Sequence, residues 1–221
     1  MKIFIIGAGR MGALLAKRLH NPEREIWLSD VNALKAYKVA KQAGCSFGSV
    51  QLAAGAQVVV LALPAEFTLA AAKDLKLYLK AGTLVVNIAT KAATEPLQRE
   101  LAGINVQVVG VKFIGHAQET LQGEIPLLVA DTENDEVFAL VSDIFNSLGP
   151  VVKGAEELVE KINTLATEES IKAAVNIRKG LTELGIGEDM IQIAIANTGA
   201  GSMKAFSRGD LGGFARQLLN E

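Results

Sequence analysis

Three glycines near the N-terminus follow the spacing Gly7-x-Gly9-x-x-Gly12, between an apolar run and a stretch with helical periodicity. In this pattern the first glycine permits a tight turn, the second lets a pyrophosphate approach the backbone, and the third lets the helix pack closely on the strand. The helix N-terminus adds unpaired N–H groups and a partial positive charge. The pattern therefore predicts a dinucleotide-binding loop, with a simple strand-to-helix turn as the alternative. The loop residues are Gly7, Ala8, Gly9, Arg10, Met11 and Gly12.

A carboxylate follows at the end of the second predicted strand. Residues 25–30 read EIWLSD, and Asp30 lies eighteen residues after Gly12. A carboxylate at this position accepts hydrogen bonds from both ribose hydroxyls of NAD and repels the 2′-phosphate of NADP. We therefore expect NAD as the cofactor, with NADP as the alternative. Asp30 could instead cap the next helix, but Asn32 is available for that role.

Further polar residues follow the later predicted strands, and ligands of open α/β sheets lie beyond the carboxyl ends of strands. We expect Leu63 and Pro64 to turn the chain along the cofactor, although Pro64 could simply end its strand. Asn87 and Thr90 are candidates to bind the nicotinamide ribose or carboxamide. The alternative is that these two side chains only satisfy the loop backbone.

Lys112 and His116 are the cationic or titratable candidates at the end of a later strand. A lysine there can orient a carboxylate or polarise a carbonyl or imine, and a histidine can donate a proton during hydride transfer. We therefore predict Lys112 and His116 as catalytic residues. A lysine and a histidine with purely structural roles are the alternative. One cysteine and two histidines leave little from which to build a metal site, so none is predicted.

Short apolar runs alternate with helix-like stretches over the first two-thirds of the chain, which predicts a Rossmann-type α/β domain with a parallel sheet covered on both faces. The predicted strands are residues 2–6, 25–30, 58–64, 83–89, 106–113 and 125–130. After Gly149-Pro150 the apolar residues recur at helical spacing, in predicted helices over residues 155–184 and 189–206 and a last short helix. We place the domains at residues 1–153 and 154–221.

The helical segment is small for an independent core. Its second helix is rich in small residues, and a glycine inside a helix costs ~1 kcal/mol relative to alanine. We therefore expect this segment to pack against a second copy of itself, forming a homodimer. An irregular helix with a kink is the alternative.

The composition excludes several other classes of protein. Basic residues form no run and the formal net charge is -2, which argues against binding to nucleic acid or to an anionic membrane. The longest apolar stretch, residues 56–65, is about half the length that spans a bilayer. The apolar start is interrupted at Gly7, Gly9 and Arg10, unlike a signal peptide. We expect a cytoplasmic protein.

The opening IFIIGAGRMG, the strand VVVLALP and the helical tail resemble the pyrroline-5-carboxylate reductases and the coenzyme-F420-dependent NADP oxidoreductases. In the tail, residues 178–190 resemble the reductase stretch that links two long dimerisation helices, and residues 196–219 resemble the following helix and the turn into the next. The reductases also carry a Ser-Pro-Gly-Gly-Thr-Thr segment, which would follow residue 221. Their Lys-Pro strand end is Leu63-Pro64 here, and Asp30 departs from the NADP preference of both groups.

The resemblance and the motifs together predict an NAD(P)-dependent oxidoreductase. It would transfer a hydride between the nicotinamide and a small imine, carbonyl or deazaflavin substrate. The alternative is a dinucleotide-binding sensor or regulatory protein without catalysis. A third possibility, a β-hydroxyacid or prephenate-type dehydrogenase, is suggested by the Gly-x-x-x-x-Gly-His stretch at residues 110–116.

Overall fold

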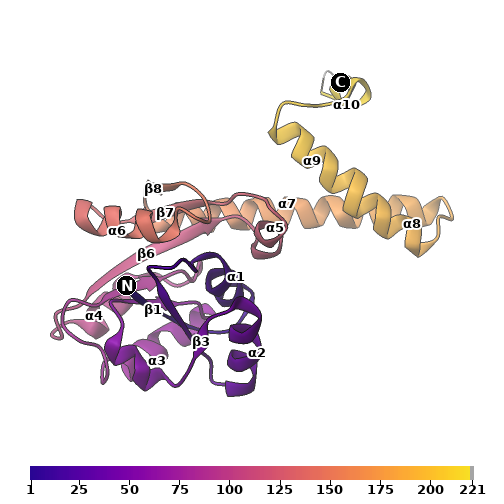
Figure 1. The fold of residues 1–221 in the computed structure, drawn as a ribbon. Helices are drawn as coiled ribbons and strands as arrows, with labels where there is room; N and C mark the ends of the chain where they lie inside the picture. The colour runs from indigo at the N-terminus through magenta and orange to yellow at the C-terminus, as the bar shows by residue number, and fades with distance from the viewer. Residues whose placement is uncertain (220–221) are drawn as a thin grey trace. The chain divides into compact units, whose positions relative to one another are not determined.

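One eight-stranded sheet forms the centre of the larger part of the molecule. The computed structural model describes residues 1–219, and its strands lie in the order β3-β2-β1-β4-β5-β6-β7-β8 (Figure 1). The six-strand block from β3 to β6 is entirely parallel. The strands are β1 (Lys2–Ile6), β2 (Glu25–Ser29), β3 (Ser46–Phe47), β4 (Val58–Leu61), β5 (Leu84–Asn87), β6 (Gln107–Ile114), β7 (Leu127–Asp131) and β8 (Val151–Lys153).

Helices cover both faces of the sheet because its central strands are apolar on both sides. Successive side chains of a strand point to opposite faces, so Ile3 and Ile5 enter one hydrophobic core and Phe4 enters the other. Helices α1, α2 and α6 supply the first core, and α3 and α4 supply the second. The predicted fold class is confirmed. The helices of this part are α1 (Arg10–Arg18), α2 (Ala33–Ala43), the 3-10 turn η1 (Val50–Gly55), α3 (Ala65–Leu75), α4 (Glu95–Leu101), α5 (Ala117–Leu121) and α6 (Asp135–Phe145).

The expectation of a wholly parallel sheet is wrong at one edge, because β7 pairs with β6 in the antiparallel direction. A parallel return would have to run back along β6, whose eight residues extend over about 26 Å. The connecting helix α5 has five residues and covers only about 8 Å. The chain therefore turns back directly. Strand β8, which the sequence analysis missed, has three residues and is too short to show a period.

The chain divides into two compact units, residues 1–163 and 164–221. The helix α7 (Glu156–Glu183) belongs to both. Its first turns complete the first unit, where Glu156 and Val159 are buried. The compact unit therefore extends beyond residue 153, where the sequence analysis placed the boundary. No helix within residues 1–219 is long and apolar enough to cross a membrane.

Helices are the only regular secondary structure among the described residues of the second unit. The latter part of α7 is followed by α8 (Glu188–Ile193), the π-helical turn η2 (Ala194–Gly199), α9 (Ala200–Ser207) and α10 (Gly213–Gln217). The π turn η2 thus interrupts the helix that was predicted over residues 189–206. An irregular helix was the alternative to a dimer contact as the explanation of its small residues. A Cβ atom on Gly199 would lie 3.1 Å from Cδ1 of Ile177, so this glycine allows close contact with α7 of the same chain.

Candidate functional site

The glycine loop has the backbone geometry that the sequence motif requires. Gly7 has a φ of +106°, a region that favours glycine, and a Cβ atom there would lie 2.2 Å from the carbonyl oxygen of Ala62. A Cβ atom on Gly12 would lie 1.8 Å from the carbonyl oxygen of Gly7. These two glycines are therefore needed for the folded loop itself, because β1, β4 and α1 meet there with no room for a side chain.

Gly9 has a different role from its two neighbours. Its φ is -74°, which any residue can adopt, and no described atom beyond its chain neighbours lies within 4 Å of a Cβ built there. Gly9 is the N-cap of α1, and no described side chain caps this helix. The first N–H groups of α1 therefore remain available to an anion, and the backbone at Gly9 is open to the approach that the motif predicts for a pyrophosphate. Arg10 is exposed in the first turn of the same helix.

Asp30 anchors the glycine loop from the end of β2. Its Oδ2 accepts a hydrogen bond from the N–H of Ala8 at 2.7 Å, and its Oδ1 accepts one from the N–H of Asn32 at 2.9 Å. The Lys35 ammonium lies 3.7 Å from Oδ2. Burial raises the pKa of Asp30, but these N–H groups and Lys35 outweigh it, so the pKa lies below its ordinary value. The carboxylate therefore stays ionised at neutral pH.

The arrangement around Asp30 is compatible with a second task at the ribose. Its side chain remains 12% exposed, and each carboxylate oxygen can accept more than one hydrogen bond. The helix α2 is capped instead by Asn32, whose Oδ1 accepts the N–H of Lys35 at 3.0 Å. The availability of Asn32 for capping is confirmed. The ribose contact of Asp30 stays a prediction.

The predicted residues after β4 and β5 lie at the same sheet edge as the glycine loop, because all these strands are parallel. Leu63 is half-buried, and its Cδ2 would be 3.1 Å from a Cβ atom on Gly7. Pro64 is exposed at the N-cap of α3, and Thr90 is half-buried in the loop that follows β5. These three residues line the edge where the sequence analysis placed the cofactor.

Asn87 at the end of β5 has no exposed surface. Its amide nitrogen donates to the carbonyl oxygen of Ala92 at 2.8 Å and to Oγ1 of Thr94 at 3.1 Å. Its Oδ1 accepts the N–H of Ala89 at 3.1 Å. Asn87 thus satisfies the loop backbone, which was the alternative reading of this residue. A direct contact with the cofactor stays a prediction.

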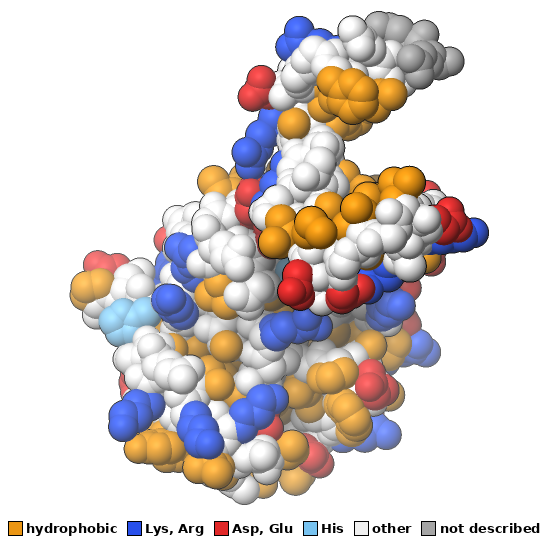
Figure 2. Space-filling model, turned by 90° about the vertical axis from the view of Figure 1, so that its right-hand side faces the viewer, with side chains coloured by type: hydrophobic (Ala, Val, Ile, Leu, Met, Phe, Trp, Pro, Cys, Tyr) orange, Lys and Arg blue, Asp and Glu red, His pale blue; other side chains and the backbone are white. Residues whose placement is uncertain are grey.

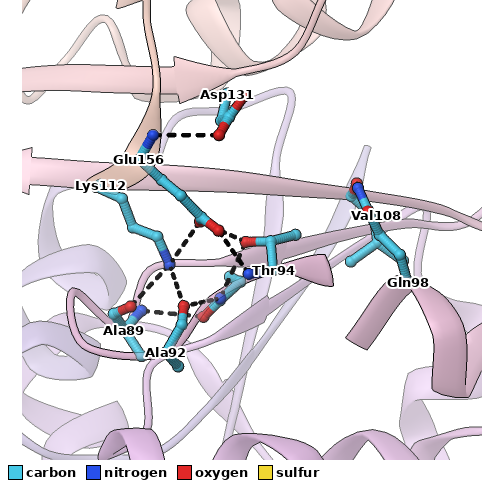
Figure 3. Close-up of polar contacts among 9 residues, drawn as sticks. Ala89, Ala92, Thr94, Gln98, Val108, Lys112, Asp131 and Glu156 are labelled. Carbon is cyan, nitrogen blue, oxygen red and sulfur yellow. Dashed lines mark hydrogen bonds and ion pairs between the residues drawn. The ribbon is translucent and has the colours of Figure 1, made fainter. Parts of the chain in front are cut away.

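Lys112 reaches the same loop from β6, and its side chain is completely buried (Figure 3). Its Nζ donates to the carbonyl oxygens of Ala89 and Ala92 at 2.7 and 2.9 Å and lies 3.2 Å from Oε2 of Glu156. Burial lowers the pKa of Lys112, and the charge of Glu156 opposes that shift. Within residues 1–219, no cluster of histidine, cysteine and carboxylate side chains could hold a metal ion.

Glu156 and Thr94 also belong to this cluster, and neither was predicted from the sequence. Glu156, in the first turn of α7, accepts the N–H of Thr94 at 2.6 Å through Oε1 and the Thr94 hydroxyl at 2.6 Å through Oε2 (Figure 3). A signal for this contact was present in Gly110, since a glycine inside a strand often marks a close approach. A Cβ atom on Gly110 would lie 2.3 Å from Oε2 of Glu156.

His116, the other predicted catalytic residue, is exposed. It lies two residues beyond β6, at the N-cap of α5. An exposed imidazole at a carboxyl end of the sheet is accessible to a substrate, whereas the ammonium of Lys112 is enclosed. Catalytic roles for both residues stay predictions.

The sheet order and the glycine loop define a Rossmann-type dinucleotide-binding domain. The family model of the NAD binding domain of 6-phosphogluconate dehydrogenase matches residues 2–159, and the chain belongs to this family. This family match confirms the expected cofactor, NAD with NADP as the alternative.

The chain is also similar to individual dehydrogenases and reductases. It is 26% identical over 167 residues to a glycerol-3-phosphate dehydrogenase (NAD(P)+) of Fusobacterium nucleatum, covering 66% of this chain and 50% of that one. The chain therefore spans about half the length of this curated relative.

Two solved structures share the fold at low sequence identity. A pyrroline-5-carboxylate reductase of Coxiella burnetii has a TM-score of 0.74 at 17% identity, covering 99% of this chain and 83% of that one. A 3-hydroxyisobutyrate dehydrogenase of Salmonella typhimurium has a TM-score of 0.74 at 18% identity, covering 95% and 79%. The resemblance to the pyrroline-5-carboxylate reductases is thus confirmed for the fold.

Substitution by alanine should have different effects at Gly12, which packs against the loop backbone, and at Gly9, which faces open space. We expect Gly12→Ala to lower the unfolding free energy by about 1–3 kcal/mol, because its methyl group would overlap Gly7. We expect Gly9→Ala to leave stability unchanged but to weaken NADH binding about tenfold, because its methyl group occupies the space for the pyrophosphate. Urea unfolding and titration of NADH fluorescence measure the two effects. Wild-type NADH affinity in Gly9→Ala would contradict the assignment.

A second prediction concerns Asp30. Asp30→Ala removes the acceptor of the Ala8 N–H group and the predicted acceptor for the ribose hydroxyls, so the Kd of NADH should rise about tenfold or more. The Kd of NADPH should rise less, because the substitution also removes repulsion of the 2′-phosphate. Lys35→Ala, which removes only the ion partner, is the control. Equal weakening of both dinucleotides would show that Asp30 only anchors the loop.

Proposed function

We propose that the chain is an NAD(P)-dependent oxidoreductase that transfers a hydride between the nicotinamide and a small imine, carbonyl or deazaflavin substrate. The observation that carries the proposal is the open space above Gly9 at the uncapped start of α1, within a domain of the NAD-binding family. The dinucleotide supplies the hydride chemistry when bound. The protein must then position the substrate and supply a proton.

The substrate class is supported by the names of similar proteins. Glycerol-3-phosphate dehydrogenase, pyrroline-5-carboxylate reductase and 3-hydroxyisobutyrate dehydrogenase all act at a carbon bonded to oxygen or nitrogen. These names favour a carbonyl or imine and its reduced form. A deazaflavin partner rests on the sequence resemblance alone.

His116 is the group best suited to handle the proton. It is exposed at the carboxyl end of β6, and an imidazole can donate or accept a proton near neutral pH.

A dinucleotide-binding sensor without catalysis is the second candidate function. It is favoured by the enclosure of Lys112, which leaves His116 as the accessible member of the predicted catalytic pair.

The test is turnover of NADH or NADPH with a cyclic imine, a 3-oxo acid, a phosphorylated ketone and a deazaflavin. With an accepted substrate, His116→Gln should lower kcat about 100-fold or more and leave the Kd of NADH unchanged. His20→Gln, at the other histidine, is the matched control and should have no effect. Tight NADH binding with no turnover of any substrate class would favour the sensor.

We also propose a homodimer, formed by the helical unit, in a cytoplasmic protein. Ile191 is the one hydrophobic side chain fully buried among the described residues of this unit. Large apolar side chains stay exposed, including Ile171, Val175, Phe206 and Phe214, and hydrophobic surface is visible on these helices (Figure 2). A unit of this size rarely makes a core alone, and a second copy offers a matching apolar surface.

The double variant Ile171→Glu with Val175→Glu should convert the dimer to a monomer, because burial of each side chain contributes about 1.5–3 kcal/mol. Sedimentation velocity measures the change. Lys38→Glu, on α2 of the first unit, is the control for altered charge. A wild-type protein that sediments as a monomer would contradict the proposal.

A further inference from the structure

The buried cluster around Lys112 holds one loop of the dinucleotide-binding edge. The ammonium has three N–H donors, and three oxygens surround it, from Ala89, Ala92 and Glu156 (Figure 3). The ammonium thus donates hydrogen bonds to two loop carbonyls and forms an ion pair with the carboxylate of Glu156. The side chain of Lys112 also has no exposed surface.

The sheet order determines which half of a dinucleotide would meet this loop. Asp30 follows β2, the glycine loop follows β1, and the next strands across the sheet are β4 and β5. A dinucleotide with its adenosine ribose at Asp30 and its pyrophosphate at Gly9 must extend towards the ends of β4 and β5. The loop of residues 88–94, which follows β5, then lies on the nicotinamide side.

We propose that Glu156 and Lys112 are positioning residues that set the loop of residues 88–94 for the nicotinamide half of the cofactor. The inference rests on the proposed cofactor site. Glu156 fixes one end of the loop through the N–H and hydroxyl of Thr94. Lys112 fixes the middle by drawing two loop carbonyls inward. Thr90, the predicted nicotinamide ligand, lies between these points.

The two charges act as a unit, because neither has water as a substitute partner. The side chain of Lys112 is 0% exposed and that of Glu156 is 8% exposed. Removing one member of a buried pair leaves an uncompensated charge. Neutralising Glu156 should therefore weaken the hold on the N–H and hydroxyl of Thr94 and leave Lys112 without its counter-ion. The loop would lose its fixed position at that end, while the glycine loop keeps its own anchor at Asp30.

The experiment compares the affinities of NADH and of ADP-ribose, which lacks the nicotinamide. Glu156→Gln removes the charge. Thr94→Val removes the hydroxyl, which donates to Glu156 and accepts from Asn87, and it keeps the ion pair between Lys112 and Glu156. Thr83→Val is the matched control: Thr83 is also buried, but it precedes β5, and its hydroxyl donates to Ala56 instead. The Kd values come from NADH fluorescence and from calorimetry with ADP-ribose.

We expect Glu156→Gln and Thr94→Val to raise the Kd of NADH about fivefold or more and to change that of ADP-ribose less than about twofold. Thr83→Val should change neither. If Glu156→Gln does not fold, Thr94→Val decides the matter, because it leaves no unpaired charge. Equal weakening of both ligands, or unchanged NADH affinity, would overturn the positioning role.

Hydrogen exchange without any ligand gives an independent readout. The amides of residues 88–94 should exchange faster in Glu156→Gln and Thr94→Val than in the wild type, and those of the glycine loop should not. Unchanged exchange in the loop would also overturn the inference. Failure of the wild-type protein to bind NADH would instead refute the proposed cofactor site, and the positioning role with it.

Discussion

The enclosed ammonium of Lys112 imposes an electrostatic constraint on several parts of the first unit. Removing an ammonium from water costs several kcal/mol, so its position in the core requires oxygen partners on every donor. The fold supplies them from two distant segments, the loop after β5 and the first turn of α7. Residue 110 must then be glycine, because a Cβ atom there would lie 2.3 Å from Oε2 of Glu156. The buried ammonium of Lys112 thereby constrains the loop after β5, the first turn of α7 and residue 110 of β6.

The glycine loop depends on a constraint of another kind, which is steric. Gly7 and Gly12 have no room for a side chain, so β1, β4 and α1 are joined backbone to backbone. The Asp30 carboxylate then holds the N–H of Ala8 from β2. Steric contacts thus shape the sheet edge at the glycine loop, while electrostatic contacts shape it at the loop after β5. The two halves of the cofactor edge can therefore respond separately to substitution.

The features that sequence reasoning predicted are those with local causes. The glycine spacing, the position of Asp30 and the both-face burial of the strands are each visible in a short window of sequence. The contact of Glu156 with Thr94 joins residues 62 positions apart, and hydrophobic periodicity in the sequence does not predict such a long-range polar contact. The antiparallel turn into β7 was also missed, because it depends on the shortness of α5. Asn87 was identified as important, but its neighbours could not be foreseen.

The second unit shows why small residues alone do not identify an interface. The glycine-rich stretch predicted contact with a second copy, yet Gly199 already accommodates Ile177 of the same chain. The π turn η2 absorbs the irregularity that these residues introduce. Large apolar side chains remain exposed once this intrachain contact is made, and it is these that support the proposed partner. Close backbone approach within the chain explains Gly199, and the exposed hydrophobic surface is what supports the proposed homodimer.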